Sequence, residues 1–362
     1  MNNVAEVTSY SDFPQSLLLI HSRAMTSFKL RSVLASAVAA AVVLVGLGAG
    51  TASAGERRIA TLAPKGSAWV NILEEGARRL EKDTEGRIKI KFYPGGTQGD
   101  EKDVIRKIKL KQLDGAALTT VGLSFIYPGI RVLQLPYLFD TVEEVDYVRA
   151  KMWPYFQQKF EEKGFKLMYP GDVGWTHLYS NQALESLADV KKVKFWAWTD
   201  DPIVRAYFKK LKVSSVPLGV PEVQSALKTG RITGCYGSPL AAVALQWYTE
   251  VSHATEEPVG YGIGAMVIRL DVWEADSAAD KKAEDKVGKK IGNKLVKRVR
   301  KDNERAKKAM KKNGIKFTAT PEKLKKKLVE DAEAIWTELA GDVYTKKELE
   351  LVLKYRKEFR SK

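Results

Sequence analysis

Apolar and polar residues alternate along the chain with two periods, which together predict a regular succession of strands and helices. Residues 88–92 read Ile-Lys-Ile-Lys-Phe, as expected for a strand with one buried face. Apolar residues recur at spacings of three and four in 69–80, which predicts an amphipathic helix with Ser67 as its cap. The first half also predicts strands at 57–62 and 115–119 and a helix at 100–111. This β-α-β-α-β order implies a parallel sheet covered by helices.

The second half repeats the alternation and then becomes helical. The expected strands are 165–169, 175–179, 194–198, 213–217 and 264–270, and the expected helices are 202–211, 221–227 and 240–247. Residues 278–310 are helical in pattern and contain no proline. At 1.5 Å per residue this helix would be roughly 50 Å long, longer than one small domain, so we expect it to brace two lobes. Two further helices are expected from Pro321 and from Thr345.

The N-terminal region, 1–54, has the composition of an export signal. A short basic segment follows Met25, an apolar run occupies 33–47, and an Ala-Ser-Ala sequence ends at Ala54. These are the three parts of a secretory signal peptide. The apolar run is shorter than the roughly 20 residues that a membrane-spanning helix needs. We therefore expect cleavage after Ala54 and a periplasmic mature chain, with a retained anchor as the alternative; translation can start at Met1 or at Met25.

The formal net charge of +16 is unevenly distributed. Residues 281–362 hold 27 Lys and Arg against 13 Asp and Glu, whereas residues 55–280 hold 30 against 29. The basic excess is interspersed with acidic residues, as on solvated helix faces, and no basic motif is interleaved with aromatic residues. We expect no nucleic-acid partner. Contact of these basic helices with a membrane surface or an acidic protein stays open.

The mature chain offers few residues for catalysis or metal binding. Cys235 is the only cysteine, which excludes an internal disulfide, and His177 and His253 are the only histidines after the expected cleavage site. A thiolate–imidazole pair of Cys235 with His177 is a weak candidate, because nothing in the sequence orients the imidazole. Asp200 and Asp201 precede a helix that begins with proline, where acidic residues are usually caps. We predict no catalytic residue, no metal and no cofactor.

Five stretches, in order, resemble the solute-binding subunits of tripartite ATP-independent periplasmic (TRAP) transporters of the DctP type. They are 92–100 (Phe-Tyr-Pro-Gly-Gly-Thr-Gln-Gly-Asp), 134–139 (Gln-Leu-Pro-Tyr-Leu-Phe), 216–230, 234–240 and 246–251. The resemblance covers nearly the whole mature chain. It implies a two-lobed α/β periplasmic binding protein with the ligand cleft between the lobes, a long helix spanning both, and a membrane permease as partner. The lobes would be 55–174 with 258–304, and 175–257 with 305–362, closing by bending near 173–176 and 260–264.

The positions at which this family holds a carboxylate are changed here. Typical members have an arginine in a motif resembling Lys-Ile-Arg-Val-Pro, where this chain has Trp196 in Lys-Phe-Trp-Ala-Trp. Thr176 stands where many members have a second arginine. Since a buried carboxylate needs a charged partner to offset its desolvation, the change favours an apolar or amphipathic ligand, or a cation over aromatic rings. The resemblance places these residues at the cleft: Trp175, Thr176, Trp196, Trp198, Tyr236, Ser238 and Trp247. For Trp247, core packing is an equal alternative.

Cleft charges depleted in this way are a feature of a TRAP branch associated with a tetratricopeptide-repeat partner protein and with hydrophobic ligands. The chain is similar to that branch, which implies such a periplasmic partner beside the permease. Two alternatives stay open. One is binding of an organic acid without the usual arginine; the other is presentation of a ligand to a signalling partner, because one fold serves both uses.

Overall fold

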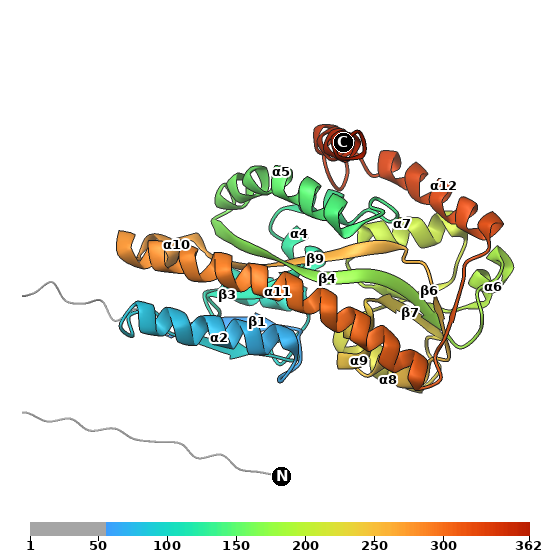
Figure 1. Cartoon of the computed structure of the whole chain (residues 1–362), viewed down its shortest axis with the longest axis horizontal. Helices are drawn as coiled ribbons and strands as arrows, with labels where there is room; N and C mark the ends of the chain where they lie inside the picture. Colours follow the sequence, from blue (N-terminus) through green and yellow to red (C-terminus); the bar gives the residue numbers. More distant parts are fainter. Residues whose placement is uncertain (1–55) are drawn as a thin grey trace, which may run out of the picture. The chain divides into compact units, whose positions relative to one another are not determined.

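The computed structural model describes residues 56–362, so the expected signal peptide at 1–54 lies outside the described residues. Ten strands form one sheet, ordered β2-β1-β3-β9-β4-β7-β5-β6, with β8 and β10 added beside β4 (Figure 1). Helices cover this sheet, as the sequence predicts for an α/β protein. Within residues 56–362, no helix is both long enough and apolar enough to cross a bilayer.

The first lobe contains the predicted parallel strands. β1 (Arg57–Thr61) pairs in parallel with β2 (Ile90–Tyr93) and β3 (Gly115–Thr119), with α2 (Ala68–Asp83) and α3 (Glu101–Lys109) as the connecting helices. The Ser67 side chain accepts from the backbone N–H of Val70 and caps α2, as predicted. The Asp100 side chain caps α3 by accepting from the backbone N–H of Glu101. After β3 the chain forms α4 (Thr120–Ser124) and the 3-10 helix η1 (Pro128–Gln134).

The second lobe repeats the arrangement. β5 (Phe195–Trp198) pairs in parallel with β6 (Ser215–Leu218) and β7 (Gly234–Gly237). The helices are α6 (Leu187–Lys192), α7 (Pro202–Leu211), α8 (Val223–Lys228) after the turn η2 (Val220–Glu222), and α9 (Pro239–Ala244). The helix predicted at 240–247 ends earlier, because Gln246 adopts a left-handed conformation (φ 59°) and a 3-10 turn, η3 (Trp247–Glu250), follows.

Two long strands join the lobes. β4 (Phe165–Ser180) is one strand of 16 residues, so the prediction of two separate strands at 165–169 and 175–179 was wrong. Its pairing with β9 (Gly260–Arg269) shifts register between Leu167 and Pro170 and again between Asp172 and Gly174. Bulges therefore accommodate the proline and glycines that suggested a break between two strands. β9 also pairs with β3, whereas β4 continues to β7 and to β8 (His253–Thr255) in the second lobe.

The helix α5 (Val142–Glu161), which was not predicted from the sequence, packs against β4 and contains Pro154 in its interior. An interior proline removes one helical hydrogen bond and usually breaks the helix. Here buried side chains on one face, including Val148, Trp153 and Phe156, hold the helix against the sheet.

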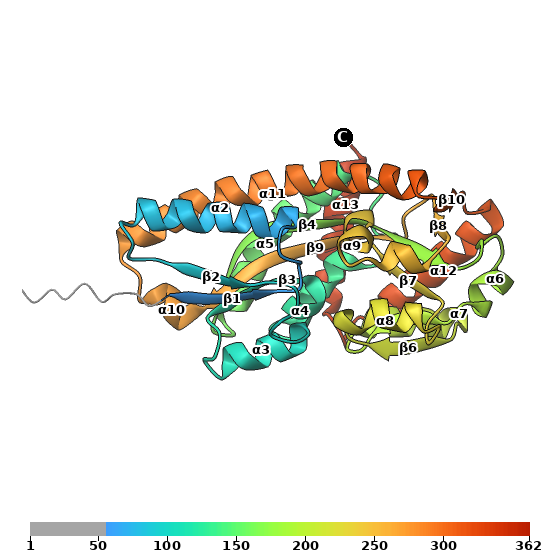
Figure 2. The same ribbon diagram turned by 90° about the horizontal axis from the view of Figure 1, so that it is seen from below.

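The long helix α11 (Ala278–Lys312) extends the predicted 278–310 by two residues. It packs against α2 and β4 at one end and against α9 at the other, so it spans both lobes (Figure 2). Gly288 and Gly292 face Tyr169 of β4, and a Cβ atom at Gly288 would lie 2.0 Å from that ring. These glycines let the helix approach the crossing strand closely.

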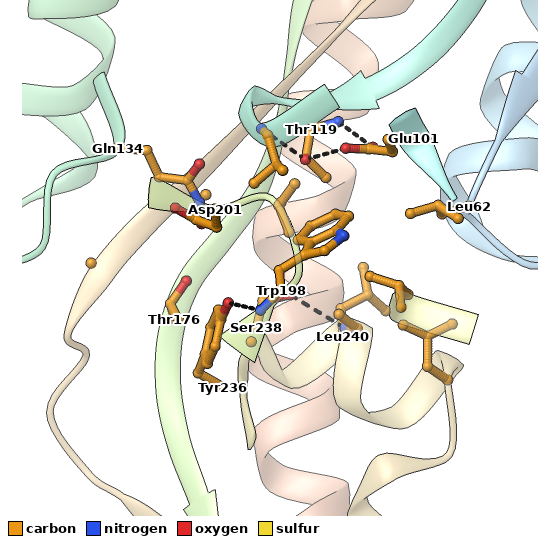
Figure 3. Close-up of a pocket in the computed structure, with 18 of the residues that line it drawn as sticks. Leu62, Glu101, Thr119, Gln134, Thr176, Trp198, Asp201, Tyr236, Ser238 and Leu240 are labelled. Atoms are coloured by element: carbon orange, nitrogen blue, oxygen red, sulfur yellow. Dashed lines mark hydrogen bonds between the residues drawn. The ribbon is translucent and has the colours of Figure 1, made fainter. Parts of the chain in front are cut away.

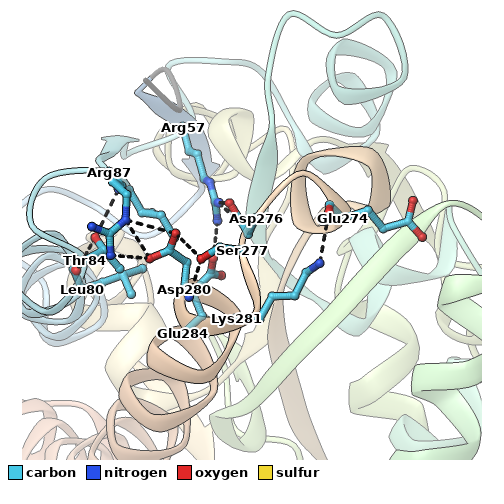
Figure 4. Close-up of polar contacts among 11 residues, drawn as sticks. Arg57, Leu80, Thr84, Arg87, Glu274, Asp276, Ser277, Asp280, Lys281 and Glu284 are labelled. Carbon is cyan, nitrogen blue, oxygen red and sulfur yellow. Dashed lines mark hydrogen bonds and ion pairs between the residues drawn. The ribbon is translucent and has the colours of Figure 1, made fainter. Parts of the chain in front are cut away.

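Ion pairs fix the start of α11 (Figure 4). The buried guanidinium of Arg57 donates to Asp276 at 2.5 Å and to Glu284 at 2.8 Å, and Arg87 donates to Asp280 at 3.0 Å. Ser277 caps the helix through the backbone N–H of Asp280. The helix therefore begins on the edge of the first lobe.

The last elements are α10 (Leu270–Glu274), which precedes α11, then β10 (Lys316–Thr318), α12 (Glu322–Glu338) and α13 (Lys346–Arg360). α12 packs against α7 in the second lobe, whereas α13 packs against α5 and η1 in the first. The lobe boundaries expected from the sequence stay a prediction. They group both C-terminal helices with the second lobe, and the packing of α13 instead favours the first.

Candidate functional site

A cavity of about 250 Å³ lies between the two lobes, beside the crossing strands β4 and β9 (Figure 3). On this measure roughly 10–15 Å³ holds one water molecule, so the cavity has room for a ligand of many atoms. The first lobe lines it with the ends of β1 and β3, the residues that follow these strands, and η1, and the second lobe with β5, β7, α7 and α9. Most lining side chains are apolar, among them Leu62, Leu118, Phe208 and Leu240.

Six of the seven residues predicted at the cleft line this cavity. They are Thr176, Trp196, Trp198, Tyr236, Ser238 and Trp247. Trp175 is not among the lining residues, since neighbours on a strand point to opposite faces and Thr176 faces the cavity. The Trp175 ring packs edge-on against Tyr261 of β9, with ring centroids 4.8 Å apart. Contact of these residues with a ligand stays a prediction.

Four aromatic side chains form a cluster on the second-lobe wall. The Trp196 ring stacks on Tyr236 at 4.7 Å with an interplanar angle of 15°, and Trp247 packs against it at 5.3 Å. Trp198 lies 5.8 Å from Trp196. Only 2% of Trp196 is exposed, and its indole N–H donates to the Leu218 carbonyl at 2.9 Å. Trp196 therefore belongs to the core of the lobe as well as to the cavity wall.

Three charged residues line the cavity within the described part of the chain: Glu101, Arg131 and Asp201. Of these, only Asp201 was singled out from the sequence, as a helix cap. The structure confirms that role, because its carboxylate accepts from the backbone N–H groups of Ile203 and Val204. Asp201 also accepts from Arg131 at 2.6 Å. A lone arginine in the apolar segment 129–133 was the available signal that Arg131 is buried.

Glu101, the first residue of α3, is 2% exposed. Its carboxylate accepts from the backbone N–H and the hydroxyl of Thr119 and from the backbone N–H of Gly122, each at 2.7 Å. Burial raises the pKa of the carboxyl to about 7, against the opposite influence of these hydrogen bonds. Glu101 therefore takes up a proton near neutral pH, inside the cavity wall.

This shift predicts a pH-dependent stability. The folded pKa is about 7 and the ordinary value is 4.5, so between these pH values the folded protein holds a proton that the unfolded chain has released. The associated stabilisation is fully present below pH 4.5 and is lost as pH rises to 7, an effect on the order of 1–3 kcal/mol. We expect the stability of wild type relative to Glu101→Gln to fall across this window. Urea unfolding at half-unit pH steps measures it, and a constant difference would contradict the assignment.

The environments of His177 and Cys235 do not favour a thiolate–imidazole pair. His177 Nδ1 lies 2.8 Å from the Thr255 carbonyl, and burial lowers the pKa of the imidazole to about 4. Cys235 is fully buried, and burial raises the pKa of its thiol far above the ordinary value. Both groups are neutral near pH 7, so the weak thiolate–imidazole candidate gains no support.

Polar contacts join the lobes at the edge of the cavity, and three of them involve the segment 198–201. The Trp198 indole N–H donates to Asp100 at 2.7 Å, and Lys102 lies 3.0 Å from Asp200. The third contact is the buried pair of Arg131 with Asp201. Asp100, Lys102 and Arg131 belong to the first lobe, so these contacts form only when the lobes meet.

The expected hinge segments, 173–176 and 260–264, lie in the crossing strands. Gly174 has φ +110°, and a Cβ atom there would lie 2.4 Å from the Asn303 amide nitrogen of α11. Only glycine fits this approach. Bending at these segments stays a prediction.

A sequence model of the family described as bacterial extracellular solute-binding protein, family 7 (DctP), matches residues 59–342. Among curated proteins, the sialic acid-binding periplasmic protein SiaP of Vibrio cholerae is 28% identical over 195 residues, 51% of this chain and 58% of the relative. The 2,3-diketo-L-gulonate-binding periplasmic protein YiaO of Escherichia coli is 25% identical over 155 residues, 42% of this chain and 47% of the relative. The chain spans about half the length of the curated relatives that it matches.

Solved structures share the fold at lower sequence identity. DctP7 of Bordetella pertussis, a solute receptor binding pyroglutamic acid, superposes with a TM-score of 0.78 at 16% identity, covering 83% of this chain and 99% of the other. A TRAP periplasmic solute-binding protein of Xanthobacter autotrophicus with bound β-D-galacturonate gives 0.78 at 19% identity, with the same coverage. These matches confirm the predicted two-lobed α/β fold.

Proposed function

Because the chain belongs to bacterial extracellular solute-binding protein family 7, a family of solute receptors rather than enzymes, we propose that it is the periplasmic ligand-binding subunit of a TRAP transporter. Its ligand would be an apolar or amphipathic molecule held in the cavity between the lobes. One observation carries this choice. Within the described residues, the only charged groups that line the cavity, Glu101, Arg131 and Asp201, are all hydrogen-bonded or paired inside the protein.

Capture would follow from movement of the lobes. In the open form the ligand reaches the apolar wall of one lobe, and closure brings the aromatic cluster and the first-lobe lining around it. The contacts of segment 198–201 with the first lobe stabilise the closed form. A ligand that binds the closed form better shifts the population toward it, and a membrane permease would recognise that form. A tetratricopeptide-repeat protein is a further proposed partner.

Binding of an organic acid is the second candidate, and the names of the relatives favour it. The two curated relatives bind sialic acid and 2,3-diketo-L-gulonate, and the two solved structures bind pyroglutamic acid and β-D-galacturonate. In this chain an acid would have to compete with Asp201 for Arg131, the one basic residue that lines the cavity in the described part of the chain.

Native mass spectrometry of the mature protein, followed by denaturation and identification of any released molecule, tests the proposal. We expect a co-purifying apolar or amphipathic molecule. Ala244→Trp, at the end of α9, would place an indole in the cavity and lower retention about tenfold or more. Ala279→Trp on the exposed start of α11 is the matched control and should retain the molecule.

The opposite result is equally specific. An empty protein whose melting temperature rises with simple carboxylates, and for which Ala244→Trp abolishes that rise, would replace the apolar proposal with organic-acid binding.

A further inference from the structure

Arg131 is a buried guanidinium with one donor left over. It lies in η1 and is 1% exposed. One terminal nitrogen donates to Asp201 at 2.6 Å, and the other donates to Gln134 at 2.8 Å and to Thr120 at 3.3 Å. The Nε–H is buried and has no hydrogen-bond partner within residues 56–362. Both terminal nitrogens, in contrast, have partners in the protein, and Asp201 is the carboxylate that pairs with the guanidinium.

Asp201 approaches Arg131 from the other lobe. It is 2% exposed and is fixed at the start of α7 by accepting from the backbone N–H groups of Ile203 and Val204. Neither residue depends on the other for its place, since each is held by its own lobe. The ion pair therefore forms when the lobes meet, at the point where both residues line the cavity.

A guanidinium buried in a ligand cavity needs a counter-charge, which comes either from the ligand or from the protein. We propose that Asp201 is an internal counter-ion that occupies the position of a ligand carboxylate on Arg131. The cavity then excludes simple carboxylates and admits neutral molecules. A carboxylate that entered would meet no uncompensated cation among the lining residues and would lie near the carboxyl groups of Asp201 and Glu101.

The same geometry narrows the ligand class. Asp201 neutralises the charge of Arg131, and the remaining lining is mostly apolar. The ligand is thus a neutral, mostly apolar molecule. This inference rests on the proposed function, because it specifies the ligand of the same cavity.

Asp201→Asn tests the counter-ion directly. Asparagine caps helices as well as aspartate does, so α7 keeps its start while Arg131 loses its counter-charge. We expect Asp201→Asn to bind formate, acetate or pyroglutamate at least about tenfold more tightly than wild type, measured by calorimetry and by melting temperature. The double variant Arg131→Gln/Asp201→Asn should lose this gain.

Asp200→Asn is the matched control. It removes the neighbouring carboxylate, which pairs with the exposed Lys102 and does not line the cavity, and it should gain no carboxylate binding. If Asp201→Asn does not fold, Asp201→Ser, which also caps and leaves room for a small anion, should regain melting temperature when formate is added.

The results separate this inference from the proposed function. If Asp201→Asn does not bind carboxylates, or if formate does not raise the melting temperature of Asp201→Ser, Asp201 is not the proposed counter-ion. The proposed function still stands in that case if wild type carries its apolar ligand. Tight binding of carboxylates by wild type itself overturns the proposed function and the counter-ion together.

Discussion

Trp196→Ala is expected to lower the free energy of unfolding by about 3–5 kcal/mol, the range seen when a buried tryptophan or phenylalanine is truncated. Trp196 is among the largest fully buried side chains of the protein, and it stacks on Tyr236 and packs against Trp247. Removing it leaves a void that these rings fill only partly. The same change removes part of the cavity wall, so loss of the co-purifying ligand should accompany the loss of stability.

Trp196→Phe is the matched variant. It keeps an aromatic ring in the stack but removes the indole N–H that donates to the Leu218 carbonyl, so its cost should be smaller, about 1–2 kcal/mol. Urea denaturation of both variants measures the difference. Trp196→Ala could instead lose the ligand while its free energy of unfolding falls by less than about 1 kcal/mol. That result would mean that the ring is only a ligand contact and not part of the core.

The fold was predictable because its signals are local. Ser67 and Asp201 cap helices that begin where the sequence predicts, and the three strands predicted in the first half formed the expected parallel pairs. The errors also have local causes. Pro154 concealed α5, and Pro170 with its neighbouring glycine concealed the continuity of β4, because bulges and packing outweighed the backbone preference of these residues.

The site was less predictable because its charged residues are far apart in sequence and come together only in the folded protein. The cleft positions of the aromatic residues came from a family resemblance, and the structure brings six of the seven together. Arg131 and Asp201 are 70 residues apart in sequence and lie on different lobes. No periodicity links two such residues, so the sequence identified Asp201 as a cap and overlooked its ion pair. Glu101 was overlooked for the same reason, since its partners lie at the end of β3 and in α4.

Asp172→Asn is expected to be as costly as Trp196→Ala, by about 3–5 kcal/mol, because it removes the charge from a fully buried carboxylate that has two arginine partners. Asp172 lies on β4 where the lobes join and is 0% exposed. It accepts from Arg149 of α5 at 2.5 Å, from Arg300 of α11 at 2.6 Å and from the hydroxyl of Tyr261 on β9 at 2.5 Å. One carboxylate therefore ties both crossing strands to the two helices that cover them.

Asp146 provides a control that contacts the same two arginines. It accepts from Arg149 at 2.5 Å and from Arg300 at 2.6 Å, yet its side chain is 43% exposed, so water replaces it when the charge is removed. We expect Asp146→Asn to cost less than about 1 kcal/mol, and urea denaturation of the two variants measures the contrast. Equal losses of unfolding free energy in the two variants would show that only the total negative charge near the two arginines matters, and not its burial. A cost confined to Asp172→Asn would show that the crossing strands depend on a buried acceptor at this position, which any bending of the lobes must leave intact.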